Sequence, residues 1–476
     1  MKTIYSAAID LGATSGRVIL GAWAKNRLTL REVHRFSNAF VSLGAHDYWD
    51  VAGLWREVQT GLRQAVAALP RGARLASVGV DTWGCDHVLL NDAGRLVFPA
   101  HAYRDARTQP GVHHLANTRA ALDRLYAATG IPNVFFNSSL QLGEAVASCP
   151  ALADLATRCL FLPDYFNFLL SGRMANELTI ASTTQLLDVH STGWSRAALD
   201  YFHLPAHWFS APVLAGTRLG TVQGIPALKG TQVIAVPGHD TACAYDAMPA
   251  APDGTDLYIS SGTWSLVGFE SATPLLGPEA LVARISNERI GDGRYRPLTN
   301  VIGLWLLEGT LKDFAQRPTD DRSWAALITA AGKLPPPARL LDVTDPAFTN
   351  PPSMKGAIDA QLKKHRVPAP KNLAGYTRLI CDSLGHGHGD AMRAFEHLAG
   401  RKFRRILIVG GGSKNRLLCQ ATADAAGLPV VSFQIEGTAV GNLASQLIAQ
   451  GAVKDLATFR RHFARQLKST TYTPGG

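Results

Sequence analysis

Asp10-Leu-Gly-Ala-Thr-Ser-Gly-Arg17 lies between two apolar runs, residues 7–9 and 18–20. This pattern predicts a strand that ends at an acidic residue, a tight glycine-rich turn, and a second strand that returns beside the first. Such a turn presents consecutive backbone N–H groups to a phosphate, with two hydroxyl side chains beside them. A carboxylate at its mouth is the kind of group that Mg²⁺ takes together with phosphate oxygens and water. The same residues also fit an ordinary hairpin in which the glycines only supply positive φ.

The same pattern returns in the second half of the chain. Residues 257–267 predict a strand, a Gly/Ser/Thr turn that contains Gly262 and Thr263, and another strand. Two such hairpins, one opening each half, indicate two related halves that face one another, which strengthens the phosphate-binding interpretation of both. A chain of 476 residues also exceeds what one hydrophobic core normally serves, so two domains are expected.

A third glycine-rich segment follows a predicted strand at residues 405–409. Gly410-Gly411-Gly412-Ser413 leads into a predicted helix that starts near Lys414 and ends at Gly427. The segment is similar to a dinucleotide fingerprint, but Asn415 stands where the third glycine would be. A nucleotide still has access to bare backbone and a helix N-terminus here. The chain contains no G-x-x-x-x-G-K-[ST] motif.

Candidate catalytic residues follow two predicted strands, at residues 75–81 and 233–236. Ligands of α/β sheets gather at the carboxyl ends of strands. Asp240 is the candidate base, because a carboxylate there accepts a proton from a substrate hydroxyl during phosphoryl transfer. Position alone also fits Asp240 as the N-cap of a following helix. His239 is either a ligand contact or a structural donor.

Other polar and aromatic side chains are candidates for binding a polyol. Asp81, Asp86 and Arg104 would converge on hydroxyl groups, although Arg104 and Asp105 would equally form a structural ion pair. Trp83 and Trp264 offer flat faces for a sugar ring, but core packing is the default expectation for both.

Composition limits the classes of protein that the chain fits. It is 46% hydrophobic and 18% charged, which is typical of a folded globular protein. No apolar stretch approaches the roughly 20 residues that span a bilayer, and the amino terminus has no signal-type segment, so a soluble cytoplasmic protein is predicted. The six cysteines are scattered, which favours reduced thiols. The net charge of +10 is dispersed, which favours anionic small ligands over nucleic acid.

The segment His386-Gly-His-Gly-Asp390 has the composition of a metal motif. Two histidines two residues apart do not share a helix face, and no further ligands are evident, so we expect no metal there. The pair His113-His114 gives the same conclusion. Gly385, Gly387 and Gly389 are expected to interrupt a predicted helix, at roughly 1 kcal/mol each relative to alanine.

Ten segments in order carry a family resemblance that runs nearly end to end. They are AIDLGATSGRV (8–18), DTWGCDHVLL (81–90), AYRDART (102–108), LPDYFNFLLSGRM (162–174), TTQLLD (183–188), GHDTA (238–242), SSGTWSLVGFES (260–271), GLWLLE (303–308), IVGGGSKN (408–415) and EGTAVGN (436–442). The chain resembles FGGY-type carbohydrate kinases of the actin/ribonuclease-H-like superfamily. The resemblance implies an α/β fold of two actin-like domains with a ligand cleft between them, residues 1–243 and 244–476.

The resemblance also implies ATP and Mg²⁺ as cofactors, and a role for each candidate residue. The first domain would carry one phosphate hairpin, the sugar site and the catalytic Asp240, and the second domain the other hairpin and the adenosine site. The nucleotide would be held by Ala13, Thr14, Ser15, Gly16, Arg17, Gly262, Thr263, Glu308, Gly411, Gly412 and Asn415, with Asp10 serving the metal. Gly84, His239, Asp240, Thr241 and Asn300 would line the sugar site. The residue patterns themselves add Asp81, Trp83, Asp86 and Arg104 as predicted sugar contacts.

The implied reaction is ATP-dependent phosphorylation of the C1 hydroxyl of a 6-deoxy-ketohexose. L-Rhamnulose is the expected sugar, with L-fuculose or another ketose or polyol as the alternative. Glu308 departs from the glutamine that rhamnulose kinases often have there, and it adds negative charge close to the expected phosphates. An actin-like ATPase without sugar-kinase activity is the more remote alternative. The partners expected are the sugar and ATP only, with no nucleic acid or membrane, in a monomer or homodimer.

Overall fold

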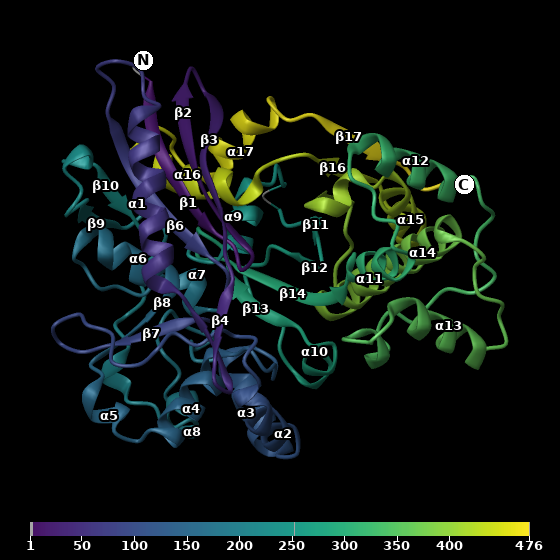
Figure 1. Cartoon of the computed structure of the whole chain (residues 1–476), viewed down its shortest axis with the longest axis horizontal. Helices are drawn as coiled ribbons and strands as arrows, with labels where there is room; N and C mark the ends of the chain where they lie inside the picture. Colours follow the sequence, from purple (N-terminus) through teal and green to yellow (C-terminus); the bar gives the residue numbers. More distant parts are fainter. Residues whose placement is uncertain (1–2, 252, 476) are drawn as a thin grey trace. The chain divides into compact units, whose positions relative to one another are not determined.

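The computed structural model describes residues 3–251 and 253–475 and divides into two compact units (Figure 1). Unit 1 comprises Met1–Pro249, Ser271–Pro297 and Glu436–Gln466. Unit 2 comprises Ala250–Glu270, Leu298–Ile435 and Leu467–Gly476. Each unit contains a β-sheet with helices, which confirms the predicted α/β class. Both units are assembled from separate stretches of chain, whereas the predicted domains are divided once, after residue 243.

Unit 1 is built on a six-stranded sheet in the order β3-β2-β1-β6-β10-β9. Its strands are β1 (Ile4–Leu11), β2 (Ser15–Ala24), β3 (Arg27–Ser37), β6 (Leu75–Thr82), β9 (Arg218–Thr221) and β10 (Gln232–Ile234). The central strands β1, β6 and β10 run parallel, and the outer strands pair antiparallel to them or to each other. The carboxyl ends of β1, β6 and β10 therefore meet at one edge of the sheet.

Two helices cover opposite faces of this sheet, α1 (Val51–Ala67) and α16 (Gly437–Ala449). A Cβ atom added at Gly21 of β2 would lie 2.6 Å from a leucine of α16, and one added at Gly61 of α1 would lie 2.3 Å from Val18 of β2. Val18 and Gly21 are three residues apart on one strand, so they point to opposite faces. Glycine at these positions lets both helices approach the sheet closely.

The remaining elements of unit 1 surround a second apolar core that includes Phe161, Leu186 and Trp208. The strands are β4 (Phe40–Leu43), β5 (His46–Trp49), β7 (His87–Leu90), β8 (Arg158–Phe161) and β13 (Ser286–Arg289). The helices are α2 (Gln109–Ala116), α3 (Arg119–Thr129), α4 (Ser138–Ser148), α5 (Leu152–Leu155), α6 (Leu162–Ser171), α7 (Leu178–Ala181), α8 (Arg196–Tyr201), α9 (Asp240–Ala247), α10 (Pro278–Val282) and α17 (Leu456–Ala464).

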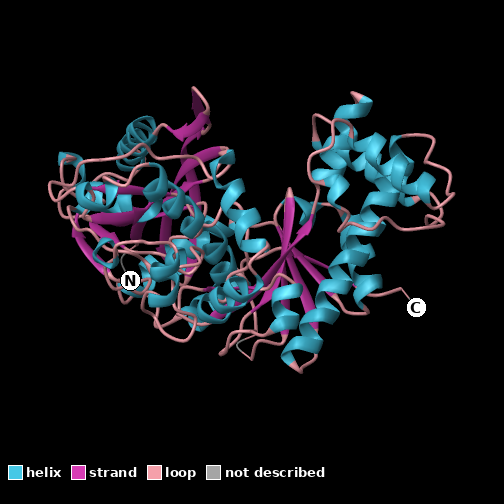
Figure 2. Ribbon diagram, turned by 90° about the horizontal axis from the view of Figure 1, so that it is seen from below, coloured by secondary structure: helices cyan, strands magenta, loops and turns pink. Residues whose placement is uncertain are grey.

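Unit 2 contains a sheet in the order β14-β12-β11-β15-β16-β17, with helices packed around it (Figure 2). Its strands are β11 (Asp256–Ser261), β12 (Trp264–Phe269), β14 (Tyr295–Ile302, which begins in unit 1), β15 (Arg405–Val409), β16 (Val430–Phe433) and β17 (Ser469–Tyr472). Its helices are α11 (Trp305–Phe314), α12 (Asp321–Gly332), α13 (Met354–Lys364), α14 (Leu373–Ala399) and α15 (Arg416–Ala426). Strand β15 and the helix after it lie where the sequence predicts them.

The prediction that glycines 385, 387 and 389 interrupt a helix is wrong. Helix α14 is continuous over 27 residues and includes all three. A Cβ added at Gly385 would lie 2.6 Å from the backbone of Ala421, and one at Gly389 would lie 2.9 Å from the backbone of Ala425. These glycines therefore let the backbones of α14 and α15 pack in close contact, which offsets their poor helix propensity.

The two histidines of the metal-like segment lie in different surroundings on α14. His388 is fully buried, its Nδ1 is 3.0 Å from Thr422 Oγ1 of α15, and burial lowers its pKa to about 4. The His386 side chain is half exposed and lies 3.0 Å from Asp390. The two rings therefore share no metal site, as their spacing predicts.

None of the helices in residues 3–251 and 253–475 has the length and apolar character needed to cross a membrane. All six cysteines are free, and five of them are buried.

Replacing Gly385 by alanine should destabilise unit 2. The added methyl group would overlap the backbone of α15, and overpacking of this kind costs about 1–3 kcal/mol. Gly332→Ala in α12 is the matched control, because no atom lies within 4 Å of a Cβ added there. That variant is expected to be neutral or more stable by up to about 1 kcal/mol. Equal thermal midpoints for the two variants would contradict the close contact of α14 with α15.

Acid should destabilise the protein partly through His388. Its pKa is 6.5 when unperturbed and about 4 in the fold, so the unfolded state binds the proton more readily between these values. The free energy of unfolding therefore decreases as pH falls from about 6.5 to about 4, by up to about 1.4 kcal/mol per pH unit. Urea unfolding from pH 7 to pH 4 should show a weaker acid dependence for His388→Asn than for wild type. His386→Asn, at the exposed histidine of the same helix, is the control. In this variant the free energy of unfolding should depend on pH as it does in wild type.

Candidate active site

Three carboxyl groups lie together at the carboxyl ends of the parallel strands of unit 1. Asp10 and Asp81 are opposite one another in the pairing of β1 with β6. Thr82 forms a bridge with His239, which places Asp240 beside them. The sequence predicts each of these residues at a strand end, and the sheet brings them together. Their closeness carries an electrostatic cost, because like charges in a poorly hydrated place oppose each other's ionisation.

The protonation of Asp10 and Asp81 reflects this cost. Burial raises the pKa of Asp10 to about 6, with Arg17 opposing the rise and Asp240 adding to it. Burial, with the charges of Asp10 and Asp240, raises the pKa of Asp81 well above its ordinary value. The Asp81 side chain is completely buried, and its Oδ2 accepts a 2.6 Å hydrogen bond from Asn442 Nδ2. Because its side chain is buried and bonded to Asn442, Asp81 is not exposed to a polyol in this conformation.

The turn after β1 is held by hydrogen bonds that fix its shape. The N–H of Gly12 donates to the carbonyl of Ser15 at 3.0 Å. Asn38 is a residue that the sequence analysis missed: its N–H donates to the Thr14 carbonyl at 3.0 Å and its Nδ2 to the Gly12 carbonyl at 2.9 Å. Thr14 is exposed, and Ala13 and Ser15 are partly exposed. These hydrogen bonds make the turn tight and leave Thr14 at its exposed tip.

Arg17, a predicted phosphate ligand, is engaged by two carboxylates in this structure. Its Nε and Nη2 each lie 2.8 Å from Asp10 Oδ2, and its Nη1 donates to Glu436, which precedes α16. Glu436 lies in the quoted segment 436–442, but nothing in the sequence pairs it with Arg17. The guanidinium therefore neutralises part of the negative charge at Asp10.

Asp240 is the first residue of α9, and His239 occupies the N-cap position without a capping side-chain bond. The alternative role of Asp240 as a helix cap is therefore not the one seen. Its Oδ1 accepts a 3.0 Å hydrogen bond from Thr241 Oγ1, and its side chain is 29% exposed. Asp240 is the most exposed of the three carboxyl groups at this edge.

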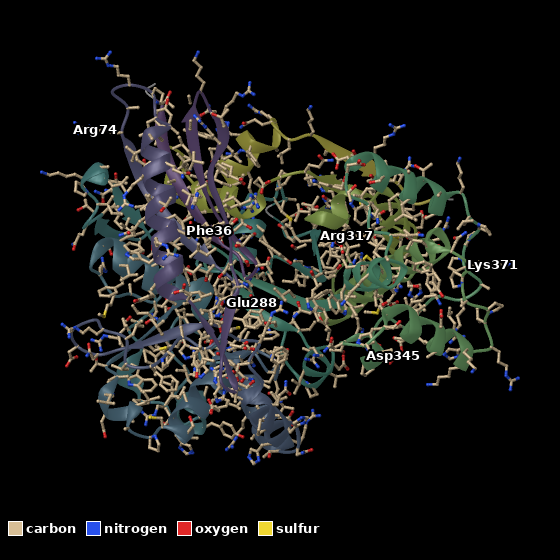
Figure 3. The ribbon with its side chains drawn as sticks, in the orientation of Figure 1. Phe36, Arg74, Glu288, Arg317, Asp345 and Lys371 are labelled. Atoms are coloured by element: carbon tan, nitrogen blue, oxygen red, sulfur yellow. The ribbon has the colours of Figure 1, made fainter. Side chains whose placement is uncertain are left out.

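His239 has two charged neighbours that the sequence analysis missed, Glu288 (labelled in Figure 3) and Arg296. Its Nδ1 lies 3.1 Å from Glu288 Oε2 and 2.6 Å from Arg296 Nη2. Its Nε2 lies 3.5 Å from Asp240 Oδ1. A Cβ added at Gly84 would lie 3.3 Å from the same Nε2, so this glycine leaves room beside the ring.

The backbone before His239 is fixed by a buried glutamate. Glu177 Oε2 accepts a 2.8 Å hydrogen bond from the N–H of Gly238, and it also caps α7 through two further N–H groups. Glu177 is almost fully buried. Its sequence position, more than sixty residues before the turn, carries no signal of this contact.

Asp86 organises a pair of tryptophans. Its Oδ2 accepts from Trp49 Nε1 at 2.5 Å and from Trp83 Nε1 at 2.8 Å, and its Oδ1 accepts from Gln141 Nε2 at 3.1 Å. The two indole rings lie 4.3 Å apart. Burial raises the pKa of Asp86 to about 6, although these donors oppose the rise. Asp86 is 1% exposed. Its carboxylate therefore orients the Trp83 ring through the hydrogen bond from Nε1.

Arg104 is exposed and does not form the ion pair with Asp105 that the sequence allows. Its Nε donates to Tyr103 Oη at 3.1 Å. Asp105 instead accepts from the N–H groups of Asp47 and Arg107. The Arg104 guanidinium therefore keeps donors available at the surface of unit 1.

The second hairpin, in unit 2, is also a tight turn, and it is one residue shorter than the first: Ser261 pairs with Ser265 across it, whereas Leu11 pairs with Gly16 across the first. The N–H of Gly262 donates to the Trp264 carbonyl at 2.9 Å. The carbonyls of Gly262 and Thr263 accept hydrogen bonds from residues 303–305 at the start of α11. Trp264 is 46% exposed, so the default expectation that it packs in a core is wrong. Asn300 is also exposed, on β14.

The glycine-rich segment after β15 combines packing and exposed backbone. A Cβ added at Gly412 would lie 2.0 Å from Ser261 Oγ, so this glycine allows close contact with β11. Gly411 is exposed and has no such contact. Asn415 caps α15, with its Oδ1 accepting from two N–H groups. Bare backbone at Gly411 and a capped helix start thus form the surface that the sequence assigns to a nucleotide.

The added charge of Glu308 is balanced within unit 2. Its Oε2 lies 2.9 Å from Nη1 of Arg317, which Figure 3 labels; Arg317 is exposed and Glu308 is half-buried. The ion pair reduces the repulsion that an unpaired glutamate would exert on a phosphate.

The donor set at Asp10 fits a magnesium ion that is completed by a nucleotide. Within residues 3–251 and 253–475, no group of three or more His, Cys, Asp or Glu side chains is arranged to hold a metal by itself. Mg²⁺ in phosphate-transferring sites usually takes one or two carboxylates and fills its other positions with phosphate oxygens and water. The Asp10 carboxylate, at the carboxyl end of β1, is a ligand of this type.

Comparison with known proteins places both halves of the chain in one family. The N-terminal domain model of the FGGY family of carbohydrate kinases matches residues 5–245, and its C-terminal domain model matches residues 257–450. A rhamnulokinase of Pectobacterium carotovorum subsp. carotovorum (strain PC1) is 41% identical over 471 residues, covering 98% of this chain and 92% of the relative. A rhamnulokinase of Klebsiella pneumoniae subsp. pneumoniae is 38% identical over 476 residues, covering 100% of this chain and 95% of the relative.

Solved structures share the fold at low sequence identity. Gluconate kinase from Lactobacillus acidophilus superposes with a TM-score of 0.80 at 14% identity, covering 100% of this chain and 94% of that one. Plasmodium falciparum glycerol kinase with ADP gives a TM-score of 0.81 at 12% identity, with coverage of 99% and 94%. These matches support the two-domain fold that the sequence predicts.

Proposed function

The chain belongs to the FGGY family of carbohydrate kinases, and from this premise we propose that it phosphorylates the C1 hydroxyl of L-rhamnulose with ATP. Relatives named rhamnulokinase align with nearly the whole chain at 38–41% identity, which supports L-rhamnulose as the sugar. We further propose that the protein is cytoplasmic, since ATP is available there. We also propose that it is a monomer or a homodimer.

The observation that carries the proposal is the environment of Asp240. Its carboxylate is partly exposed, is oriented by the Thr241 hydroxyl, and lies beside the imidazole of His239. A carboxylate so placed accepts the proton of the attacking hydroxyl. Phosphoryl transfer asks little else of the protein than positioning and charge neutralisation. We therefore assign the role of general base to Asp240.

We assign the phosphates to the two hairpin turns, one in each unit. Thr14, Ser15 and Thr263 carry hydroxyls, and the turns at residues 13–17 and 262–263 carry backbone N–H groups, of the type that bind phosphate oxygens. The N–H of Gly262 is not one of them, because it donates to the Trp264 carbonyl. Asp10 would hold Mg²⁺, which when bound neutralises charge on the phosphates. Arg17 is paired with Asp10 and Glu436 in this structure. We propose that its guanidinium balances the charge of Asp10 when no nucleotide is bound and contacts a phosphate when one is.

The adenosine is assigned to unit 2. Gly411 offers exposed backbone, while Gly412 and Asn415 set the shape of the segment by packing and capping. Glu308, paired with Arg317, lies on α11 beside the second hairpin.

We assign the sugar to side chains of unit 1 around His239. Asn300 keeps the sugar-binding role that the family resemblance implies. Gly84, Arg104 and Thr241 stay as predicted contacts. Asp81, Trp83 and Asp86 are buried, so we propose that they shape the site from behind.

A coupled ADP-release assay tests the sugar. L-Rhamnulose should give the highest kcat/KM among L-rhamnulose, L-fuculose, L-ribulose, xylulose and glycerol, and EDTA should abolish turnover. A preference for L-fuculose or another ketose would replace the substrate but keep the kinase. ATP hydrolysis that does not respond to any sugar would sink the kinase proposal and favour an actin-like ATPase.

Asp240→Asn should lose most activity while nucleotide binding is retained. General base catalysis contributes about 10²–10⁴-fold, so kcat is expected to fall by that factor, because the amide does not accept the proton. Calorimetric titration with ATP should give a near wild-type Kd. Asp292→Asn, at a partly exposed aspartate of unit 1 that pairs with Arg294, is the control and should keep wild-type kcat. Undiminished turnover in Asp240→Asn would require a different base.

A further inference from the structure

The turn that precedes α9 has every backbone polar group of Gly238 and His239 in a hydrogen bond. The Gly238 carbonyl accepts from the N–H of Thr82 at 2.9 Å, and the His239 carbonyl accepts from two N–H groups in the first turn of α9. The two N–H groups of the turn bond to side chains instead. That of Gly238 donates to Glu177 Oε2 at 2.8 Å. That of His239 donates to Thr179 Oγ1 at 3.4 Å. These two side chains complete the pairing that a buried backbone requires.

One oxygen of Glu177 accepts from four donors. Besides the N–H of Gly238, Oε2 accepts from the N–H groups of Thr179 and Ile180 at 2.9 Å and 3.1 Å, and from the Thr179 hydroxyl at 2.7 Å. These contacts cap α7, so the same oxygen joins the start of that helix to the turn. Backbone N–H groups only donate, so Oε2 is an acceptor whether the carboxyl group is ionised or neutral. Burial raises the pKa of Glu177 without changing these bonds.

Segment 177–183 also holds two other parts of unit 1 beside this turn. The Ser182 hydroxyl oxygen accepts from the N–H of Arg289, at the end of β13, at 2.9 Å. The thiol of Cys85, in the chain that follows β6, donates to the Thr183 carbonyl at 3.8 Å. All seven residues of the segment are buried. The segment therefore braces the turn, β13 and the end of β6 from inside the unit.

We propose that Glu177 and Thr179 are positioning residues for Asp240: by holding the two N–H groups of the turn, their side chains fix the place at which α9 begins and so the place of its first residue, the proposed base. The inference rests on the proposed sugar-kinase function and adds two residues to its machinery. Both side chains are 1% exposed, so they act through the backbone of the turn. Misplacing a reacting group by about 1 Å costs up to about 100-fold in rate.

Removing and restoring the acceptor at residue 177 tests the proposal. Glu177→Leu leaves the N–H of Gly238 without its partner, so kcat should fall by about 10–100-fold, while the Kd for ATP stays near wild type. Glu177→Gln should recover most of kcat, because its amide oxygen accepts from the same donors. Wild-type kcat in folded Glu177→Leu would overturn the proposal, and so would an equal loss of kcat in both variants.

A second substitution disturbs folding less, because it leaves the Glu177 carboxyl group and its cap of α7 in place. Thr179→Val removes only the oxygen that accepts from the N–H of His239. Its kcat should fall in the same direction by about 3–10-fold, and Thr179→Ser, which keeps the hydroxyl, should retain wild-type kcat. If Glu177→Leu does not fold, this pair decides the matter: wild-type kcat in Thr179→Val would overturn the proposal.

A matched control separates positioning from the general loss of a buried hydrogen bond in unit 1. Ser195 is 2% exposed and caps α8, where its Oγ accepts from the N–H of Ala198 at 3.3 Å. Ser195→Ala should lower the thermal midpoint, as the loss of a cap does, but leave kcat unchanged at temperatures where the protein is folded. A loss of kcat equal to that of Thr179→Val would overturn the positioning role.

Amide hydrogen exchange measures the state of the turn without any activity. Fragments that contain residues 238–239 should exchange slowly in wild type and in Glu177→Gln, and faster in Glu177→Leu, because the freed N–H groups open more readily. Equal exchange in wild type and folded Glu177→Leu would overturn the inference. Failure of the sugar-kinase function would instead appear as absent sugar-dependent turnover in wild type, with slow exchange at the turn retained.

Discussion

Unit 1 depends on keeping three carboxyl groups at one edge of a sheet. Parallel pairing of β1, β6 and β10 brings Asp10, Asp81 and Asp240 together, and their mutual repulsion and burial must be offset locally. Arg17 offsets the charge of Asp10, and Asn442 donates to Asp81, whose raised pKa favours its neutral form. Asp240 has the most exposed position of the three, which is why we propose it as the general base.

The helix that carries Asn442 shows why residues 436–466 belong to unit 1. Gln446 Nε2 on α16 donates to the Ala7 carbonyl at 2.9 Å and to Asn442 Oδ1 at 2.6 Å, and Ser77 Oγ donates to Gln446 Oε1. This polar ladder crosses from α16 to β1 and β6 inside the core. Buried networks of this kind are stable only when their members are satisfied. Segment 436–466 is therefore required for the strands that present Asp10 and Asp81.

The features that could be predicted from the sequence are those that depend on a short, continuous stretch of residues. Apolar runs ending in Asp10 and Asp81 locate strand ends, and the glycine-rich turns locate the hairpins. The contacts of Glu177, Glu288 and Arg296 with the turn around His239 were not predictable, because they join segments far apart in the chain. The prediction for Gly385 was wrong for a related reason. Its low helix propensity can be read from the local sequence, but the close packing it allows against the backbone of α15 cannot.

These long-range contacts share one effect, which is to fix the turn that delivers Asp240. Glu177 holds the N–H of Gly238, and Arg296 holds the ring of His239. From the other side, a Cβ added at Gly441 of α16 would lie 1.9 Å from the Cys243 carbonyl, so α16 rests directly on the backbone of α9. Transfer of a phosphoryl group depends on reacting atoms being held in place, and small displacements cost large factors in rate. The orientation of Asp240, the proposed base, is therefore set by the folded unit itself, through residues far from it in the sequence.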